Sequence, residues 1–333
     1  MTAFSKTPLR ISFFGGGSDY EEYFTDNECA VLGSSINKYV YIFELPMSTF
    51  SPKKFKLSYR TIEEVDNPSE FKHPVVSSVL KRMKWKKPIN ISTMSDLPGG
   101  TGLGSSSSFT VGLINLLQHI DKKKISQLSL ATEAYKIEHD ILKENVGLQD
   151  HLHASFGGLN LYRIIGKKIT IEPLQISNKF KTLLNESVIM VYTGTVRHAS
   201  KVLKEQLKNL HNQMNTCYIR DSANLAIEAA EKFQNTKNEK KLLIEFGKLL
   251  QESWKLKKSF SKKITTNEVD RIYQKGIELG AYGGKLCGAG GGGFIMFLID
   301  NSLKEKFSKT FGATRVLDIR FVDEGSFIRD ISN

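Results

Sequence analysis

The alternation of apolar and polar residues predicts strands in the first half of the chain. The segments 8–14 ("PLRISFF"), 38–45 ("KYVYIFEL") and 88–95 ("PINISTMS") are rich in β-branched and aromatic residues and lie between glycine, serine or proline residues. The stretch 157–174 alternates in the same way and predicts a hairpin that turns at Gly166. We therefore expect much of the first half to form a sheet.

Apolar residues recur at helical spacing elsewhere in the chain. This spacing predicts one helix that begins near Ser105, a second over 128–142 and a third through 271–280. After a predicted strand at 187–195 the chain becomes charged and mostly helical.

The change from mixed strand and helix to mostly helix falls between residues 172 and 186. A length of 333 residues fits two domains of about 150 residues each. We therefore predict an α+β protein with domains at 1–171 and 172–333, each combining a mostly antiparallel sheet with helices.

The charge balance is basic, with 47 lysines and arginines, 35 acidic residues and a formal net charge of +12. Part of the excess lies in runs such as 81–87 ("KRMKWKK") and 121–124 ("DKKK"), which we interpret as solvated faces. A nucleotide or a phosphorylated small molecule would need only a few of these lysines. Nucleic acid would favour a basic stripe with interleaved aromatic residues, which the runs lack, so we expect no nucleic-acid partner.

The cysteines and the apolar segments indicate the cellular compartment in which the protein is expected. Cys29, Cys217 and Cys287 are odd in number and lack metal-ligand spacing, so we expect free thiols in a reducing compartment. The N-terminus has no apolar core of signal-peptide length, and no window reaches about 18 uninterrupted apolar residues. We expect a cytoplasmic protein without a membrane partner, either monomeric or homodimeric.

A glycine- and serine-rich loop, Leu97–Ser108 ("LPGGTGLGSSSS"), lies between a predicted strand and a predicted helix. The first amides of a helix lack intrahelical partners and favour an anion, and glycines let the backbone approach phosphate oxygens. The spacing excludes the P-loop, because Ser105 stands where that motif has lysine. The dinucleotide fingerprint G-x-G-x-x-G also fits poorly, because the loop has glycines at 100, 102 and 104. A helix and a lysine run follow it in place of a strand that ends in an acidic residue. A flexible linker is disfavoured, since strand and helix patterns abut the loop on both sides.

Three segments resemble, in order, the three signature motifs of the GHMP small-molecule kinases. They are residues 8–20 ("PLRISFFGGGSDY"), the loop 98–106 with its P-x-x-x-G-L-G-S-S pattern, and residues 283–293 ("GGKLCGAGGGG"). The resemblance spans nearly the whole chain and implies a two-domain architecture, with an N-terminal domain like domain 2 of ribosomal protein S5 and a ferredoxin-like C-terminal domain. It also implies ATP- and Mg²⁺-dependent phosphoryl transfer to a small molecule.

Further segments favour one branch of this family. Residues 147–151 ("GLQDH") and 192–200 ("YTGTVRHAS") resemble the members that phosphorylate the anomeric hydroxyl of D-glycero-D-manno-heptose 7-phosphate. The implied product serves the synthesis of nucleotide-activated heptose and of surface polysaccharide such as capsule. Fucokinase-like phosphorylation of an unphosphorylated sugar is the nearest alternative. A non-catalytic nucleic-acid-binding protein is a remote one, motivated by the net charge.

The resemblance also implies roles for individual residues. Asp150 takes the place of the catalytic aspartate, although an N-cap role is compatible with it. Arg10 matches the basic residue beside that aspartate, where a guanidinium would keep the carboxylate ionised, and a surface arginine is the alternative. For Mg²⁺ the pattern points to Ser106 and Glu138. Ser107 is left open as another hydroxyl ligand, and a solvated helix position is the alternative for Glu138.

The remaining expectations concern the two substrates. Asp19 would accept hydrogen bonds from sugar hydroxyls, and Arg197 would pair with a distal phosphate or form a structural salt bridge. Lys285 is expected to face solvent, and His151 and His153 to be polar packing residues rather than metal ligands. The other residues expected at the sugar are Gly16, Gly17, Ser18, Gly290 and Gly291. The residues expected at the nucleotide are Pro98, Gly99, Gly100, Thr101, Gly102, Leu103, Gly104, Ser105, Ser106, Ser107 and, near the base, Asn37.

Overall fold

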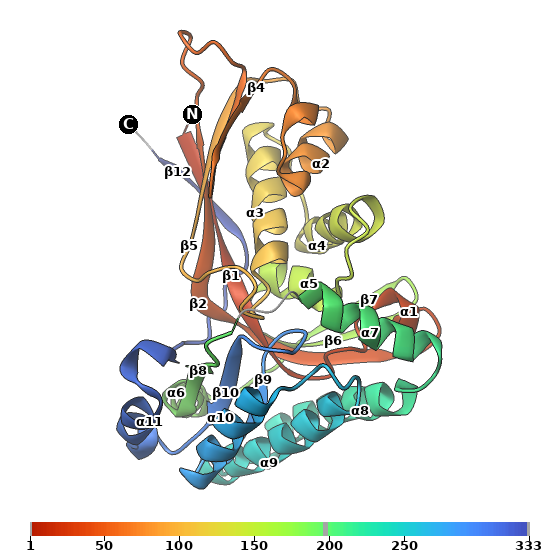
Figure 1. The fold of residues 1–333 in the computed structure, drawn as a ribbon, viewed down its shortest axis with the longest axis vertical. Coiled ribbons are helices and arrows are strands. Elements are labelled where there is room, and N and C mark those ends of the chain that lie inside the picture. The colour runs from red at the N-terminus through yellow and green to blue at the C-terminus, as the bar shows by residue number, and fades with distance from the viewer. Residues whose placement is uncertain (1, 196–198, 332–333) are drawn as a thin grey trace.

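The computed structural model describes residues 2–195 and 199–331, and its strands form two sheets (Figure 1). The larger sheet has eight strands in the order β12-β1-β2-β5-β3-β4, with β6 pairing to β2 and β7 to β6. Its pairs are antiparallel except for β3 with β5. The strands are β1 (Thr2–Phe14), β2 (Cys29–Leu45), β3 (Phe55–Ser58), β4 (Ile62–Val65), β5 (Ile89–Ser95), β6 (Leu159–Ile165), β7 (Lys168–Pro173) and β12 (Phe327–Ile331).

Helices cover one face of this sheet (Figure 1). The central one, α3, packs against β1 and β2 and buries Leu113, Leu116 and Leu117, because the helical spacing puts these apolar residues on its inner side. The helix α4 continues into a π-helical turn, Ile137–Ile141. The helices of this half are α1 (Glu21–Phe24), α2 (Pro74–Arg82), α3 (Ser105–Ile120), α4 (Gln127–Lys136) and α5 (Gln149–Phe156), with a 3₁₀ turn at Pro68–Glu70.

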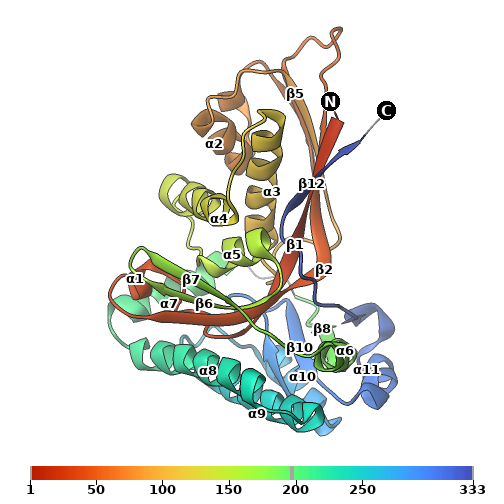
Figure 2. The ribbon, with the colours of Figure 1, turned by 180° about the vertical axis from the view of Figure 1, so that it is seen from behind.

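The second half joins a smaller sheet, in the order β11-β8-β10-β9, to two long antiparallel helices, α8 and α9 (Figure 1). The chain enters this half through α6, and its last strand, β12, returns to pair with β1 (Figure 2). The elements are α6 (Asn178–Ser187), β8 (Val188–Tyr192), α7 (Ala199–His211), α8 (Thr216–Asn235), α9 (Glu239–Lys258), α10 (Asn267–Glu278), β9 (Gly283–Leu286), β10 (Phe294–Leu298), α11 (Lys304–Phe311) and β11 (Val316–Leu317), with 3₁₀ turns at Asn301–Leu303 and Ala313–Arg315.

Most predicted elements are present, and the differences lie at strand boundaries. The helix predicted near Ser105 begins there, and the predicted hairpin is β6–β7 with its turn at Gly166. In contrast, β1 and β2 begin earlier than the predicted strands. Residues 29–36 of β2 are buried on both faces and therefore do not alternate between apolar and polar residues.

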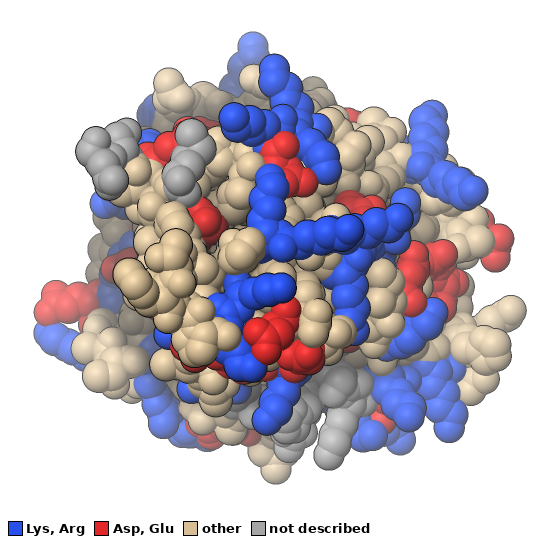
Figure 3. All heavy atoms as spheres, turned by 90° about the horizontal axis from the view of Figure 1, so that it is seen from above, with Lys and Arg blue, Asp and Glu red and all other residues tan. Residues whose placement is uncertain are grey.

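The surface observations agree with the charge analysis. In both basic runs the lysine and arginine side chains are exposed, and partners such as Glu133 and Asp121 pair with some of them. The end of the molecule seen in Figure 3 shows basic side chains mixed with acidic and uncharged ones. The three cysteines are free thiols. Among the described residues, every helix is too short or too polar to span a membrane.

Candidate active site

A cavity of about 510 Å³ lies between the two halves, and all three glycine-rich motifs contribute to its wall. The first half supplies the turn after β1, the loop before α3 and the segment 143–150. The second half supplies α7, the end of α9 and the loop between β9 and β10. Another hollow, of about 440 Å³, lies beside β6 and α6, and the only charged residues among its described lining are Lys181 and Asp323. Since ionisable groups converge on the first cavity, it is the candidate active site.

The loop before α3 turns the amino end of that helix toward the cavity. Gly104 precedes the helix with a φ of +76°, a conformation that favours glycine. Arg10 anchors the loop to β1, because its backbone N–H donates to the Leu103 carbonyl (3.0 Å) and its Nη1 donates to the Gly102 carbonyl (2.8 Å). The first amides of α3 are therefore held in a position suited to bind an anion.

The predicted nucleotide residues divide into four groups. Thr101 and Leu103 are buried inside the loop, whereas Pro98 and Gly99 are exposed at its start. Asn37 lies apart from the described cavity residues, and its carboxamide oxygen accepts the Arg320 backbone N–H (2.7 Å). The residues that line the cavity are Gly100, Gly102, Gly104, Ser105, Ser106 and Ser107.

The third glycine-rich segment packs directly on this loop. A Cβ at Gly102, where φ is +82°, would lie 2.7 Å from the Cys287 carbonyl oxygen, so the close approach of the two backbones depends on glycine. Gly288 and Ala289 line the cavity, whereas the predicted sugar residues Gly290 and Gly291 are not among its described lining residues. They turn toward the segment before α10, where a backbone carbonyl accepts the Gly291 N–H at 2.8 Å.

The prediction that Lys285 faces solvent is wrong. Lys285 is 4% exposed and its Nζ donates to the Phe13 carbonyl of β1 (2.8 Å), because all four residues of β9 are packed inside the protein. Burial, reinforced by the charge of Lys257, lowers the pKa of Lys285 well below its ordinary value.

Arg10 and Asp150 form a bidentate ion pair in the wall of the cavity. Nε and Nη2 of Arg10 donate to the two carboxylate oxygens of Asp150, each at 2.7 Å. The arginine side chain is 7% exposed, and the aspartate side chain, at 23%, is open to the cavity. Burial alone would lower the pKa of Arg10, but the Asp150 carboxylate raises it above the ordinary value. Asp150 lies in the first turn of α5 without capping that helix through its side chain.

The turn after β1 brings a second carboxylate to the cavity. Asp19 is almost completely buried and accepts the Gly17 N–H at 3.0 Å. Burial, and then the charge of Asp150, raise the pKa of Asp19. Gly16 and Gly17 line the cavity with Asp19. Ser18 turns inward, since its N–H and its hydroxyl both donate to the Gly15 carbonyl. Arg197 lies outside the described residues.

Glu138 is fully buried behind the amino end of α3, so the alternative of a solvated helix position is wrong. Its carboxylate accepts hydrogen bonds from Ser106 (3.1 Å), Ser107 (2.9 Å) and Thr110 (2.6 Å), and it contacts His151 Nε2 at 2.9 Å. Burial would raise the pKa of Glu138, but these partners, led by His151, lower it. The π-helical turn directs this carboxylate at α3, and such turns are frequent at functional sites.

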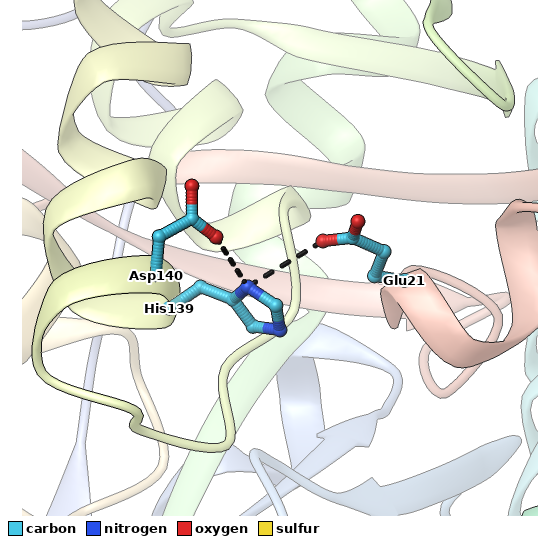
Figure 4. A group of neighbouring side chains, drawn as sticks. All are labelled: Glu21, His139 and Asp140. Atoms are coloured by element: carbon cyan, nitrogen blue, oxygen red, sulfur yellow. Dashed lines mark hydrogen bonds and ion pairs between the residues drawn. The ribbon is translucent and has the colours of Figure 1, made fainter.

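A cluster of polar side chains links the start of α1, just after the turn that carries Asp19, to this π-helical turn (Figure 4). Nδ1 of His139 lies 2.9 Å from an Asp140 carboxylate oxygen and 3.4 Å from one of Glu21. Tyr135 stacks on the His139 ring, with centroids 4.9 Å apart, and donates to Glu21 (3.3 Å). The two segments that carry Asp19 and Glu138 are thereby linked.

Both histidines of α5 are buried, but their contacts differ, since His151 Nε2 lies 2.9 Å from the Glu138 carboxylate. The His153 ring packs edge-on against Tyr162, with centroids 4.7 Å apart, and neither of its nitrogens has a hydrogen-bond partner among the described residues. Burial therefore lowers the pKa of His153 well below its ordinary value.

Several cavity residues were not anticipated from the sequence. Gln206 of α7, Lys257 at the end of α9 and Phe260 just after it all line the cavity. Lys257 had a usable signal, because it continues the buried face that Leu250 and Trp254 form on α9. A lysine on the apolar face of a helix indicates that its ammonium group is held by polar groups inside the protein.

Comparison with known proteins places the chain in a family. The GHMP kinases N-terminal domain matches residues 72–158, and the GHMP kinases C-terminal domain matches residues 227–313. The D-glycero-alpha-D-manno-heptose 7-phosphate kinase of Campylobacter jejuni is 30% identical over 343 aligned positions, which cover 96% of this chain and 97% of that protein. The chain belongs to the GHMP kinase family.

Two further relatives extend this result. The GHMP kinase described here is 23% identical to the bifunctional fucokinase/GDP-fucose pyrophosphorylase of Arabidopsis thaliana, over 90% of its own length and 30% of that longer protein. A crystal structure of a D-glycero-D-manno-heptose 1-phosphate kinase from Bacteroides thetaiotaomicron superposes with a TM-score of 0.80 at 22% identity, over 99% of this chain and 100% of the other. At that identity the match shows the fold alone, and it confirms the two-domain GHMP kinase fold expected from the motifs.

Proposed function

We propose that this GHMP kinase uses ATP to phosphorylate the anomeric hydroxyl of D-glycero-D-manno-heptose 7-phosphate, releasing ADP and the 1,7-bisphosphate. The observation that carries the proposal is the Arg10–Asp150 pair, which lies in the same cavity as the amino end of α3. Phosphoryl transfer requires little covalent chemistry from a protein beyond positioning, charge neutralisation and a proton acceptor. The product would serve the synthesis of nucleotide-activated heptose for surface polysaccharide.

The amino end of α3 is the position we assign to the nucleotide phosphates. Its unpaired amides and the helix dipole favour negative charge, and the hydroxyls of Ser105 and Ser106 add donors.

The side chains behind this helix end fit Mg²⁺, because they offer the oxygen ligands that this ion prefers. Ser106 and Glu138 would hold it, with Ser107 beside them. When bound, the ion would neutralise charge on the phosphate oxygens.

Asp150 is the residue we assign to accept the proton of the acceptor hydroxyl. As that oxygen bonds to the γ-phosphorus, the bond between the γ-phosphorus and the β–γ bridging oxygen breaks, and ADP leaves. Arg10 holds the carboxylate with two hydrogen bonds and adds positive charge where the transition state is negative. Asp19 would orient the sugar by accepting hydrogen bonds from its hydroxyls.

The similarity to the plant fucokinase supports one alternative, a kinase for an unphosphorylated sugar. One similar protein is named a heptose 7-phosphate kinase and the other a heptose 1-phosphate kinase. The test must therefore identify which sugar accepts the phosphoryl group.

The test measures ADP release by the purified full chain with three acceptors: D-glycero-D-manno-heptose 7-phosphate, the free heptose and L-fucose. We expect a kcat/KM at least about 100-fold higher for the 7-phosphate, because two hydrogen bonds to a charged group contribute about 1.5–3 kcal/mol each. Phosphorus NMR of the product should place the new phosphate on the anomeric oxygen. Preference for L-fucose would favour the alternative, and absence of ADP release with every acceptor would overturn the proposal.

Arg197 is proposed to bind the distal phosphate. Arg197→Ala should raise the KM for heptose 7-phosphate about 10-fold or more and leave kcat/KM for the free heptose unchanged. An equal loss with both acceptors would contradict this role.

A further inference from the structure

Lys257 is a buried cation without an acidic partner. It is 8% exposed, lines the cavity, and forms no ion pair with any described residue. Its Nζ donates to the carbonyl oxygens of Leu286 (2.8 Å) and Gly288. An ammonium group has three N–H donors, and no further acceptor in the described part of the chain takes the third. A charge removed from water in this way normally has a counter-ion.

The charges around Lys257 indicate what that counter-ion is. The described cavity wall brings together the cations Arg10, Lys257 and Lys285 against the carboxylates Asp19 and Asp150, while Lys143 and Glu144 offset each other. Because Asp150 is already engaged by Arg10, Asp19 is the one carboxylate left for the two lysines in the described wall, and it forms no ion pair with either of them. The inner wall thus carries an excess of positive charge and favours an anionic ligand.

The position of Lys257 connects it to the loop before α3. Its two carbonyl partners belong to β9 and the third glycine-rich segment, which packs against Gly102 through Cys287. Lys285 also lines the cavity, but it is 4% exposed and donates to the Phe13 carbonyl of β1. Lys257 is 8% exposed and is the more accessible of the two lysines to a ligand in the cavity.

We propose that Lys257 binds a phosphoryl oxygen in the cavity, as a phosphate-binding cation in addition to those already assigned, Arg10 and Arg197. This inference rests on the proposed function, since it requires that a phosphorylated substrate enters the cavity. Two sources offer the same chemistry: the phosphoryl group in transfer and the phosphate of a sugar phosphate.

The test compares Lys257→Met with Lys255→Met, which removes an exposed lysine of the same helix. We expect kcat/KM to fall by about 10²–10³-fold in Lys257→Met and to stay unchanged in Lys255→Met. A similar fall with phosphorylated and unphosphorylated acceptors would assign Lys257 to the transferred group, and a fall confined to the phosphorylated acceptor would assign it to the sugar phosphate. An unchanged kcat/KM in Lys257→Met would overturn the inference.

The pH profile separates a charge role from a structural one. Burial lowers the pKa of Lys257, nearby Cys287 opposes this shift and the charge of Arg10 on β1 adds to it, with a net pKa of about 8. Lys285 on β9 is the other cation nearby. Because kcat/KM reports the free enzyme, it should decline above about pH 8, whereas kcat should decline only at higher pH once an anion is bound. Lys257→Arg should keep activity and move the decline in kcat/KM to higher pH, and an unmoved decline would overturn the inference.

A binding measurement keeps this inference separate from the proposed function. Calorimetric titration with inorganic phosphate should show at least about 10-fold weaker binding to Lys257→Met than to the unaltered protein. If the unaltered protein phosphorylates no sugar but this difference is found, the proposed function fails and the phosphate site stands. If the two proteins bind phosphate equally well and the unaltered protein is an active kinase, the phosphate site at Lys257 is refuted and the proposed function stands.

Discussion

Replacing Asp150 by asparagine separates the catalytic use of its carboxylate from its part in the fold. The substitution keeps the shape of the side chain but exchanges one acceptor oxygen for an NH₂ group. In the native protein Nε and Nη2 of Arg10 each donate to one oxygen at 2.7 Å. After the exchange one of these donors faces another donor, and one charge-assisted hydrogen bond is lost.

The expected magnitudes differ strongly between stability and turnover. A hydrogen bond to a charged group contributes about 1.5–3 kcal/mol. Because the Asp150 side chain is 23% exposed and can rotate toward the cavity, we expect the free energy of unfolding to fall by about 2 kcal/mol. Loss of the proton acceptor should lower kcat by about 10²–10⁴-fold.

Urea unfolding measures the free energy of unfolding, and ADP release at saturating substrates measures kcat. Asp121→Asn is the matched control, since Asp121 is 19% exposed and pairs with Lys87 at 2.7 Å outside the described cavity wall. The control should lose stability without losing turnover. If Asp150→Asn keeps kcat within about threefold of the unaltered protein, the carboxylate serves the fold and the assignment of the base is refuted.

Two other substitutions test the packing around the site. Gly102→Ala should lower the melting temperature and raise the KM for ATP at least about tenfold, because its Cβ would meet the Cys287 carbonyl oxygen at 2.7 Å. Gly312→Ala is the control, since its φ of +88° is similar but nothing lies within 4 Å, and it should show only the cost of a sparsely populated backbone conformation, about 1–3 kcal/mol. Equal effects of the two substitutions would exclude the clash. Burial keeps His153 neutral in the folded protein, whereas the unfolded chain binds a proton below about pH 6.5, so stability should fall as the pH drops through that value, by up to about 1.4 kcal/mol per pH unit. His153→Phe should remove this part of the acid sensitivity in urea unfolding at pH 5 and pH 7, and an unchanged difference would contradict it.

The motifs of the first half predicted much of the site. Gly16, Gly17 and Asp19 line the cavity together with Arg10 and Asp150, in agreement with the positions expected for them. Each motif could be recognised because it is a short segment whose turn or helix start is set by its own residues, and the roles assigned to these residues stay predictions.

Sequence reasoning was wrong at Lys285, left an alternative open at Glu138 and missed Lys257. The surroundings of all three residues come from distant parts of the chain. Lys285 was expected in solvent, yet the carbonyl it contacts belongs to Phe13, 272 residues earlier. Glu138 has the same helical setting as the neighbouring acidic residues, and only the packing of the π-helical turn against α3 buries it. Lys257 stands in the run "KLKK", whose composition is that of a solvated face.

The sequence by itself determined the local chemistry of this protein: a glycine loop that ends at Ser105, a helix that starts there, and carboxylates in two other short motifs. These features follow from backbone conformation and from unpaired amides at a helix end, which depend on neighbours in the chain. Only the tertiary structure decided which charged groups share one cavity. Arg10 and Asp150 lie 140 residues apart in the sequence, and it is the packing of β1 against α3 and α5 that joins them.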